Sequence, residues 1–273
     1  MKPILLALFL PSLCLAATHD CGSDTRGSTT FQWCIDTPDR PSGEILWYFH
    51  PVFGNEQVWQ KQEDNQMVRK IWSDRGVAQP TAISISLGSF WVLHRENHSY
   101  PDFVSLILPY MEAKAGGLHG RRLLWGFSMG GFNAAQLLLR DGNLFERVVL
   151  LSPAFLTISP FASKEEVDAY FTRNNLGAVG RFKVQTFLGL LKKNYKSPEL
   201  WTANDPLELS RDGLPSGSKV YVSDGEQDDY GFHEGAELFT RQAPSRGARV
   251  EWESLKGGHK TTNPESIAKF LIP

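Results

Sequence analysis

Apolar residues along this chain recur with two different spacings. Runs rich in β-branched and aromatic residues predict strands over 29–35, 44–49, 81–87, 122–126, 147–151, 219–223 and 249–254. Between them, apolar side chains spaced at i, i+3, i+4 and i+7 predict helices over about 57–72, 101–110, 132–140, 234–241 and 264–271. This alternation predicts an α/β fold with a mostly parallel sheet and helices on both faces.

The segment 157–215 breaks the alternation. It contains two helix-prone stretches, at 164–171 and 182–193, and no strand pattern. A long insertion of this kind is usually a functional cap or lid. Because no linker or internal repeat divides the rest of the chain, we expect one domain over 18–273 that carries a helical cap at 157–215.

The first 17 residues have the pattern of a secretory signal peptide. A positive start is followed by an apolar run at 4–10, and small residues allow cleavage after Ala16 or Ala17. The run is too short to span a bilayer, and no later segment reaches the ~20 apolar residues required. Cys14 leaves acylation as a lipoprotein open, although the bulky Leu13 precedes it. We therefore expect a secreted or periplasmic protein.

Export affects the interpretation of the remaining cysteines. Without Cys14, the chain keeps an even pair, Cys21 and Cys34. An oxidising compartment favours a disulfide between them over two free thiols. The bridge would close a short loop and stabilise the fold by about 3 kcal/mol in the chain-entropy description.

Composition excludes several classes of partner. The net charge is −2 with 21% charged residues, so no basic surface for nucleic acid or an anionic membrane is expected. His94 and His98 have the i, i+4 spacing of two metal ligands on a helix, but no third ligand stands in a matching motif. We expect both to be solvated polar residues, and we expect no metal and no cofactor.

The sequence GFSMGG at 126–131 is the main chemical signal. It joins a predicted strand to a predicted helix, which is the setting of a nucleophilic serine on a tight turn. The glycines two residues before and after Ser128 supply the lack of bulk that this turn needs. Ser128 is therefore the candidate nucleophile, and the amide of Met129 is placed to bind a developing oxyanion.

A serine hydroxyl needs a base, and the base needs an orienting carboxylate. The strand at 219–223 is followed by an acidic loop with Asp224, Asp228 and Asp229, and the strand at 249–254 is followed by His259. Both loops leave the carboxyl ends of strands, where such sheets collect functional groups. The residues alone leave the three acids nearly equivalent.

Three motifs carry a resemblance to a known family. FSMGG at 127–131, GEQD at 225–228 and GGH at 257–259 resemble the signatures of α/β-hydrolases. The chain is most similar, over about 44–271, to the esterase D-like esterases, a branch with S-formylglutathione hydrolases, feruloyl esterases and mycolyltransferases. This resemblance implies the α/β-hydrolase fold, with Ser128 as nucleophile, His259 as general base and then acid, and Asp228 as the carboxylate.

The loop HPVFGN at 50–55 is similar to the family's His-Gly-x-x-Gly-Asn stretch. The likeness implies that the second oxyanion donor is the amide of Val52, with Phe53 as the neighbouring candidate. Pro51 departs from the usual glycine; it has no amide and a fixed φ, so it leaves the choice of donor open. His50 is expected to support this loop rather than to catalyse.

These features together predict an enzyme that cleaves carboxylic esters through an acyl-enzyme. The substrate would be a small-molecule or polymer-linked ester. Three alternatives stay open at this stage. An acyltransferase or a peptidase of the same fold would use the same residues, and a catalytically silent binding protein would keep the scaffold alone.

Overall fold

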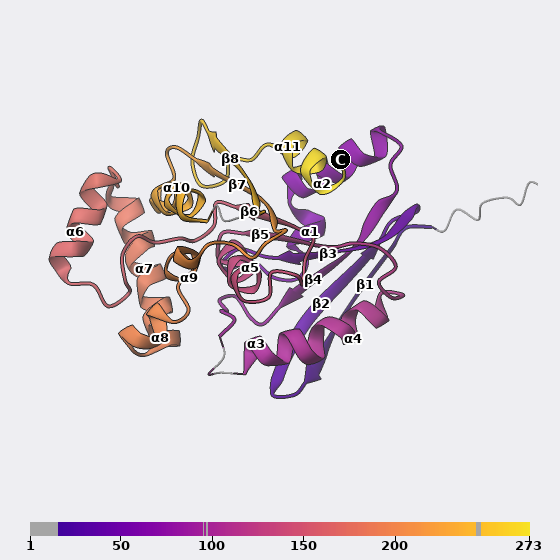
Figure 1. The fold of residues 1–273 in the computed structure, drawn as a ribbon, viewed down its shortest axis with the longest axis horizontal. Helices are drawn as coiled ribbons and strands as arrows, with labels where there is room; N and C mark the ends of the chain where they lie inside the picture. The colour runs from indigo at the N-terminus through magenta and orange to yellow at the C-terminus, as the bar shows by residue number, and fades with distance from the viewer. Residues whose placement is uncertain (1–15, 95, 97, 244–246) are drawn as a thin grey trace, which may run out of the picture.

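The computed structural model describes residues 16–94, 96, 98–243 and 247–273, which contain an eight-stranded sheet (Figure 1). The strands are β1 (Thr18–Arg26), β2 (Thr29–Thr37), β3 (Pro41–Phe49), β4 (Gln79–Ser86), β5 (Arg122–Phe127), β6 (Arg147–Leu151), β7 (Lys219–Gly225) and β8 (Arg249–Leu255). Their order across the sheet is β1-β2-β4-β3-β5-β6-β7-β8. All neighbours from β4 to β8 pair in parallel, and β2 pairs antiparallel with β1 and β4. The predicted, mostly parallel sheet is confirmed.

Strand β1 has no counterpart among the predicted strands. Its sequence, THDCGSDTR, has no alternating apolar residues, and its side chains are mostly exposed. The strand forms because it pairs residue by residue with β2 across a tight turn at Gly27, whose φ is +59°. An edge strand that covers no core can be polar throughout, so hydrophobic periodicity does not detect it.

Both faces of the sheet are covered by helices. The helices are α1 (Val58–Lys61), α2 (Glu63–Asp74), α3 (Ser99–Asp102), a π-helical turn η2 (Phe103–Ile107), α4 (Leu108–Lys114), α5 (Met129–Arg140), α10 (Phe232–Gln242) and α11 (Pro264–Leu271). Helices α2 and α11 pack together on one face (Figure 1). Helices α4, α5 and α10 contribute to the core on the other face.

Strand β3 shows how the sheet separates the two cores. Ile45, Trp47 and Phe49 point into the larger core, whereas Leu46 and Tyr48 point into the core beneath α2 and α11. All five side chains are buried. A central parallel strand is therefore apolar at every position, because each face of the pleat meets a layer of helices.

Residues 157–215 form a helical group at one end of the sheet (Figure 1). This group contains α6 (Lys164–Arg173), α7 (Ala178–Tyr195), α8 (Pro198–Thr202), α9 (Pro206–Leu209) and a short 3-10 turn, η3 (Ser210–Asp212). The segment contains no strand. It lies between β6 and β7 in the chain, as the predicted cap would, and its role as a cap remains a prediction.

The predicted disulfide is present in the structure. Cys21 of β1 and Cys34 of β2 are direct partners in the hairpin register and are bonded through their sulfur atoms. The bond ties the polar edge strand to the sheet. Residues 1–15 lie outside the described residues. They include Cys14 and all but the last two residues of the predicted signal peptide. Among the residues described, no helix combines the length and apolar character needed to cross a bilayer.

Candidate active site

Ser128 occupies the turn between β5 and α5 in an unusual backbone conformation. Its φ and ψ are 55° and −116°, values that a residue with a side chain rarely adopts. The neighbouring glycines allow the turn to close. A Cβ atom added to Gly126 would lie 2.2 Å from the carbonyl oxygen of Gly130, and one added to Gly130 would lie 2.0 Å from that of Phe49. Such strain is typical of a functional position that the surrounding structure enforces.

His259 lies between Ser128 and Asp228. The Ser128 hydroxyl is 3.0 Å from His259 Nε2, and His259 Nδ1 is 2.6 Å from Asp228 Oδ2. A carboxylate can only accept, so Nδ1 carries a proton and donates a hydrogen bond to Asp228. In the neutral ring Nε2 is then free to accept the hydrogen bond of the serine hydroxyl. The three predicted residues come from loops up to 131 positions apart in the chain and meet in one hydrogen-bonded series.

Aromatic rings surround the His259 imidazole. Phe127 stacks on it at 5.4 Å with an interplanar angle of 25°, and Tyr230 and Phe232 lie at 4.7 and 5.5 Å. These contacts restrict rotation of the ring and exclude water from most of its surface. A low local dielectric strengthens the hydrogen bonds that the imidazole makes.

Of the three candidate acids, Asp228 is the one that is hydrogen-bonded to His259. Its side chain is fully buried, and its second oxygen accepts a hydrogen bond from the amide of Tyr230 at 2.6 Å. Burial raises the pKa of this carboxyl, but the charge and hydrogen bond of His259 outweigh burial, so the pKa is lowered and the group is ionised. Asp224 accepts instead from the amide of Gly225, and Asp229 forms an ion pair with Lys183.

The two candidate oxyanion donors in the loop after β3 differ in their hydrogen bonding. The amide of Phe53 donates to the carbonyl of Ser89 at 2.7 Å, so it is already occupied. The amides of Val52 and Met129 have no hydrogen-bond partner within the described part of the chain. Of the two neighbouring candidates in this loop, Val52 therefore keeps an N–H available to a ligand.

His50 holds this loop in place. It is completely buried; its Nδ1 donates to the carbonyl of Pro51 at 2.7 Å, and its Nε2 accepts from the indole of Trp91 at 3.0 Å. Burial lowers the pKa of His50 to about 4, so the ring is neutral at physiological pH. These contacts give His50 the supporting position in the loop that the sequence predicts.

The expectation that His94 is a solvated residue is wrong. His94 is only 5% exposed; its Nδ1 is 3.0 Å from a carboxylate oxygen of Glu96, and its ring lies 5.4 Å from that of Tyr195. His98 is exposed, as expected. The i, i+4 spacing does not reveal this difference, because neither His94 nor His98 belongs to one of the described helices.

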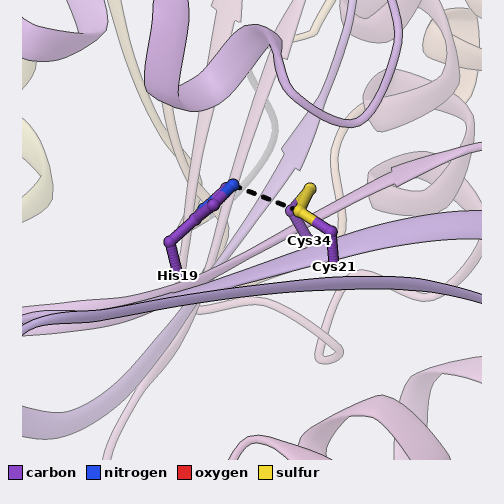
Figure 2. Close-up of side chains that lie close together, drawn as sticks. All are labelled: His19, Cys21 and Cys34. Atoms are coloured by element: carbon purple, nitrogen blue, oxygen red, sulfur yellow. Dashed lines mark hydrogen bonds between the residues drawn. A yellow bond between two sulfur atoms is a disulfide. The ribbon is translucent and has the colours of Figure 1, made fainter.

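Two groups of side chains among the described residues have metal-ligand atoms close together. One is Asp224, Asp228 and His259, where both ring nitrogens of His259 already make hydrogen bonds. The other is His19, Cys21 and Cys34 (Figure 2). There, the two sulfur atoms are joined as a disulfide, with His19 Nε2 3.2 Å from the Cys21 sulfur.

The sheet order and the serine turn between β5 and α5 place the chain in the α/β-hydrolase class. The chain matches the family described as "Putative esterase" over residues 59–263. It belongs to this esterase family, and it is a carboxylic-ester hydrolase whose substrates are small-molecule esters.

Solved structures of esterases share the fold. A ferulic acid esterase has a TM-score of 0.57 at 16% identity and covers 93% of this chain and 94% of its own. An S-formylglutathione hydrolase from Agrobacterium tumefaciens scores 0.59 at 14% identity, with 93% and 92% covered, and an arylesterase scores 0.58 at 14% identity, with 93% and 82% covered. At these identities the likeness establishes the fold. No curated protein matches this chain.

Proposed function

We propose that the chain hydrolyses carboxylic esters through an acyl-enzyme on Ser128. The observation that carries this proposal is the position of His259, with Nε2 at 3.0 Å from the Ser128 hydroxyl and Nδ1 at 2.6 Å from Asp228. A nucleophile, a base and an orienting carboxylate within hydrogen-bond distance are the arrangement that nucleophilic catalysis requires.

The reaction proceeds in two halves. His259 Nε2 removes the proton of Ser128 while the oxygen attacks the ester carbonyl, and the resulting imidazolium is stabilised by ionised Asp228. The oxyanion of the tetrahedral intermediate accepts hydrogen bonds from the free amides of Met129 and Val52. His259 then gives its proton to the departing alcohol, which leaves the acyl group on Ser128. A water molecule, deprotonated by His259, releases the acid and restores the hydroxyl.

Replacement of the nucleophile tests this proposal. Ser128→Ala should lower kcat for a simple ester such as ethyl acetate by on the order of 10⁴ or more and abolish labelling by a fluorophosphonate probe. Ser105→Ala is the matched control, because Ser105 is an exposed serine on η2 outside the site. It should hydrolyse and label like the parent. A Ser128→Ala variant that keeps the parent rate refutes the mechanism.

Two alternative reactions would use the same residues and need separate experiments. In acyl transfer, an alcohol instead of water accepts the acyl group from Ser128. Product analysis in the presence of sugar and lipid alcohols therefore distinguishes transfer from hydrolysis. Paired ester and amide substrates with the same acyl group distinguish an esterase from a peptidase. A silent binding protein on this scaffold would fail to react with the fluorophosphonate.

We also propose that the chain is exported to an oxidising compartment. The signal-like sequence at 1–17 and the Cys21–Cys34 disulfide support this location. Amino-terminal sequencing of protein from the native source should give a start at Ala17 or Thr18. A start at Cys14, with an attached lipid, would instead establish a lipoprotein, and an uncleaved start would contradict export by this signal.

A further inference from the structure

An apolar cavity of about 300 Å³ lies between the loop after β3 and helix α7. It is lined by Val52, Phe53, Phe182, Lys183, Thr186, Phe187, Leu190 and Tyr230. Half of these residues are aromatic, and one, Lys183, is charged. The volume is at the lower end of the range for small-molecule sites.

The cavity adjoins the catalytic residues on two sides. Tyr230 lines it and contacts the His259 ring at 4.7 Å. From the inner wall, Phe187 contacts Phe232 at 5.6 Å, and Phe232 contacts His259 at 5.5 Å. On the other side lies Val52, whose amide is free to bind the oxyanion. An ester with its carbonyl oxygen on this amide would therefore have one substituent in or next to the cavity.

Two aromatic rings of the lining are left in water. Phe53 is 71% exposed and Phe182 is 70% exposed, the largest values among the exposed large apolar side chains that the structure describes. Phe53 also has a φ of 63°, a strained conformation for a bulky residue. Exposed large apolar side chains grouped around a cavity indicate a binding surface, because covering them removes apolar area from water.

The charge on Lys183 is already compensated. Its ammonium group forms an ion pair with Asp229, which directly follows the catalytic acid in the chain. Gly180 of the same helix packs so closely that an added Cβ atom would lie 2.5 Å from the Asp229 carbonyl oxygen. The ion pair and this close contact fix α7 against the loop that carries Asp228. The wall that α7 contributes is therefore formed before substrate binds, and the charge of Lys183 in this wall is balanced by Asp229.

We propose that this cavity binds the uncharged apolar substituent of the ester, an alkyl chain or an aryl ring, and that α7 thereby sets substrate selectivity. The inference rests on the proposed Ser128 mechanism. The geometry predicts selectivity by apolar size, because the rings and Leu190 offer dispersion contacts and no unpaired charge.

Filling the cavity tests this inference. Thr186→Trp places an indole in the cavity from an exposed position of α7, so the core is left intact. Gln185→Trp is the matched control, since Gln185 is the exposed neighbour on the same helix and does not line the cavity. Initial rates are measured in a pH-stat with ethyl acetate as the small reference ester. Ethyl hexanoate and ethyl phenylacetate probe the acyl side, and hexyl acetate and benzyl acetate probe the alcohol side.

We expect Thr186→Trp to lower kcat/KM for the enlarged esters of one side by roughly tenfold or more relative to ethyl acetate. The side that responds identifies the substituent in the cavity, and comparison of the hexyl with the aryl esters shows which shape it prefers. Gln185→Trp should leave each ratio within about twofold of the parent.

A second pair of variants removes cavity wall instead of filling the space. Phe182→Ala should lower the same ratios, whereas Val179→Ala, at an exposed position of α7 outside the cavity, should not. If Thr186→Trp and Phe182→Ala change no ratio on either side, the cavity inference is wrong. Ethyl acetate hydrolysis that still depends on Ser128 then shows that the proposed function stands without it.

Discussion

Asp224 near the end of β7 and Asp228 in the loop that follows have carboxylate oxygens within 4.8 Å of each other, yet their pKa values are shifted in opposite directions. Burial raises the pKa of Asp224 well above its usual value, and the negative charge of Asp228 raises it further. At Asp228, the charge and hydrogen bond of His259 outweigh burial and lower the pKa. Two close buried carboxyl groups cannot both ionise readily, so Asp228, the partner of His259, ionises more readily than Asp224.

Removal of the Asp228 charge should affect the rate far more than binding. Asp228→Asn is expected to lower kcat on the order of 10⁴ with little change in KM, because an amide no longer holds the proton of His259 on Nδ1. Glu226→Gln, an exposed acid of the same loop, is the control and should retain parent kinetics. Steady-state kinetics on ethyl acetate measure both. More than a tenth of the parent kcat in Asp228→Asn would count against the assigned role.

Asp224 should make stability depend on pH. Between its unfolded pKa of about 4 and its raised folded pKa, the Asp224 carboxyl is ionised in the unfolded chain and protonated in the folded one. The unfolded state therefore binds fewer protons, and stability falls as pH rises toward the folded pKa. Asp224→Asn cannot ionise and keeps an oxygen for the Gly225 amide. Urea unfolding at pH 4, 6 and 8 should show that the free energy of unfolding of the variant increases relative to that of the parent as pH rises. A stability difference independent of pH would rule out this account.

Gly130, two residues after Ser128, should not tolerate a side chain. Gly130→Ala is expected to lower the free energy of unfolding by about 3 kcal/mol or more and to remove activity, because the new Cβ would lie 2.0 Å from the carbonyl oxygen of Phe49. Gly189→Ala is the contrasting control. Gly189 lies within α7 with open space around it, so alanine there should stabilise by about 0.5–1 kcal/mol. In denaturant titrations, the unfolding midpoint should fall for Gly130→Ala and rise for Gly189→Ala, relative to the parent.

Loss of the disulfide should weaken the edge of the sheet without altering the chemistry. The double variant Cys21→Ser/Cys34→Ser is expected to lower the free energy of unfolding by about 3 kcal/mol, since the bridge no longer limits the unfolded chain. Its kcat at 25 °C should match the parent, because both sulfur atoms lie on β1 and β2, away from Ser128. Dithiothreitol should lower the Tm of the parent to that of the double variant; a parent unaffected by full reduction would contradict this expectation.

Local patterns were sufficient for most of the elements that position the site. The serine turn was predictable because strained backbone needs glycine at fixed positions, and these positions are visible in the sequence. The order of strands and loops implied that Ser128 and His259 would meet, because the carboxyl ends of parallel strands lie at one edge of the sheet. Strand β1 was not predictable in this way, since an exposed edge strand has no apolar face.

The choice among near-equivalent side chains required the folded chain. Residue types alone left Asp224, Asp228 and Asp229 nearly equivalent, and only the likeness of GEQD at 225–228 to the family motif indicated Asp228. In the folded chain, Asp228 is the acid that is hydrogen-bonded to His259, because of how the loop turns after β7. The amide of Val52 is free, whereas the amide of Phe53 donates a hydrogen bond to the carbonyl of Ser89, which lies 36 positions away in the chain.

By itself, therefore, the sequence determined the fold class, the disulfide pair and the two most distinctive candidate site residues, Ser128 and His259. Each of these depends on periodicity, on a backbone constraint or on a rare residue at a loop. Only the tertiary structure decided the direction in which the pKa of each acid is shifted, which amide is free and which apolar side chains line one cavity. Charge state, hydrogen-bond occupancy and cavity shape depend on distances between segments that the linear order does not specify.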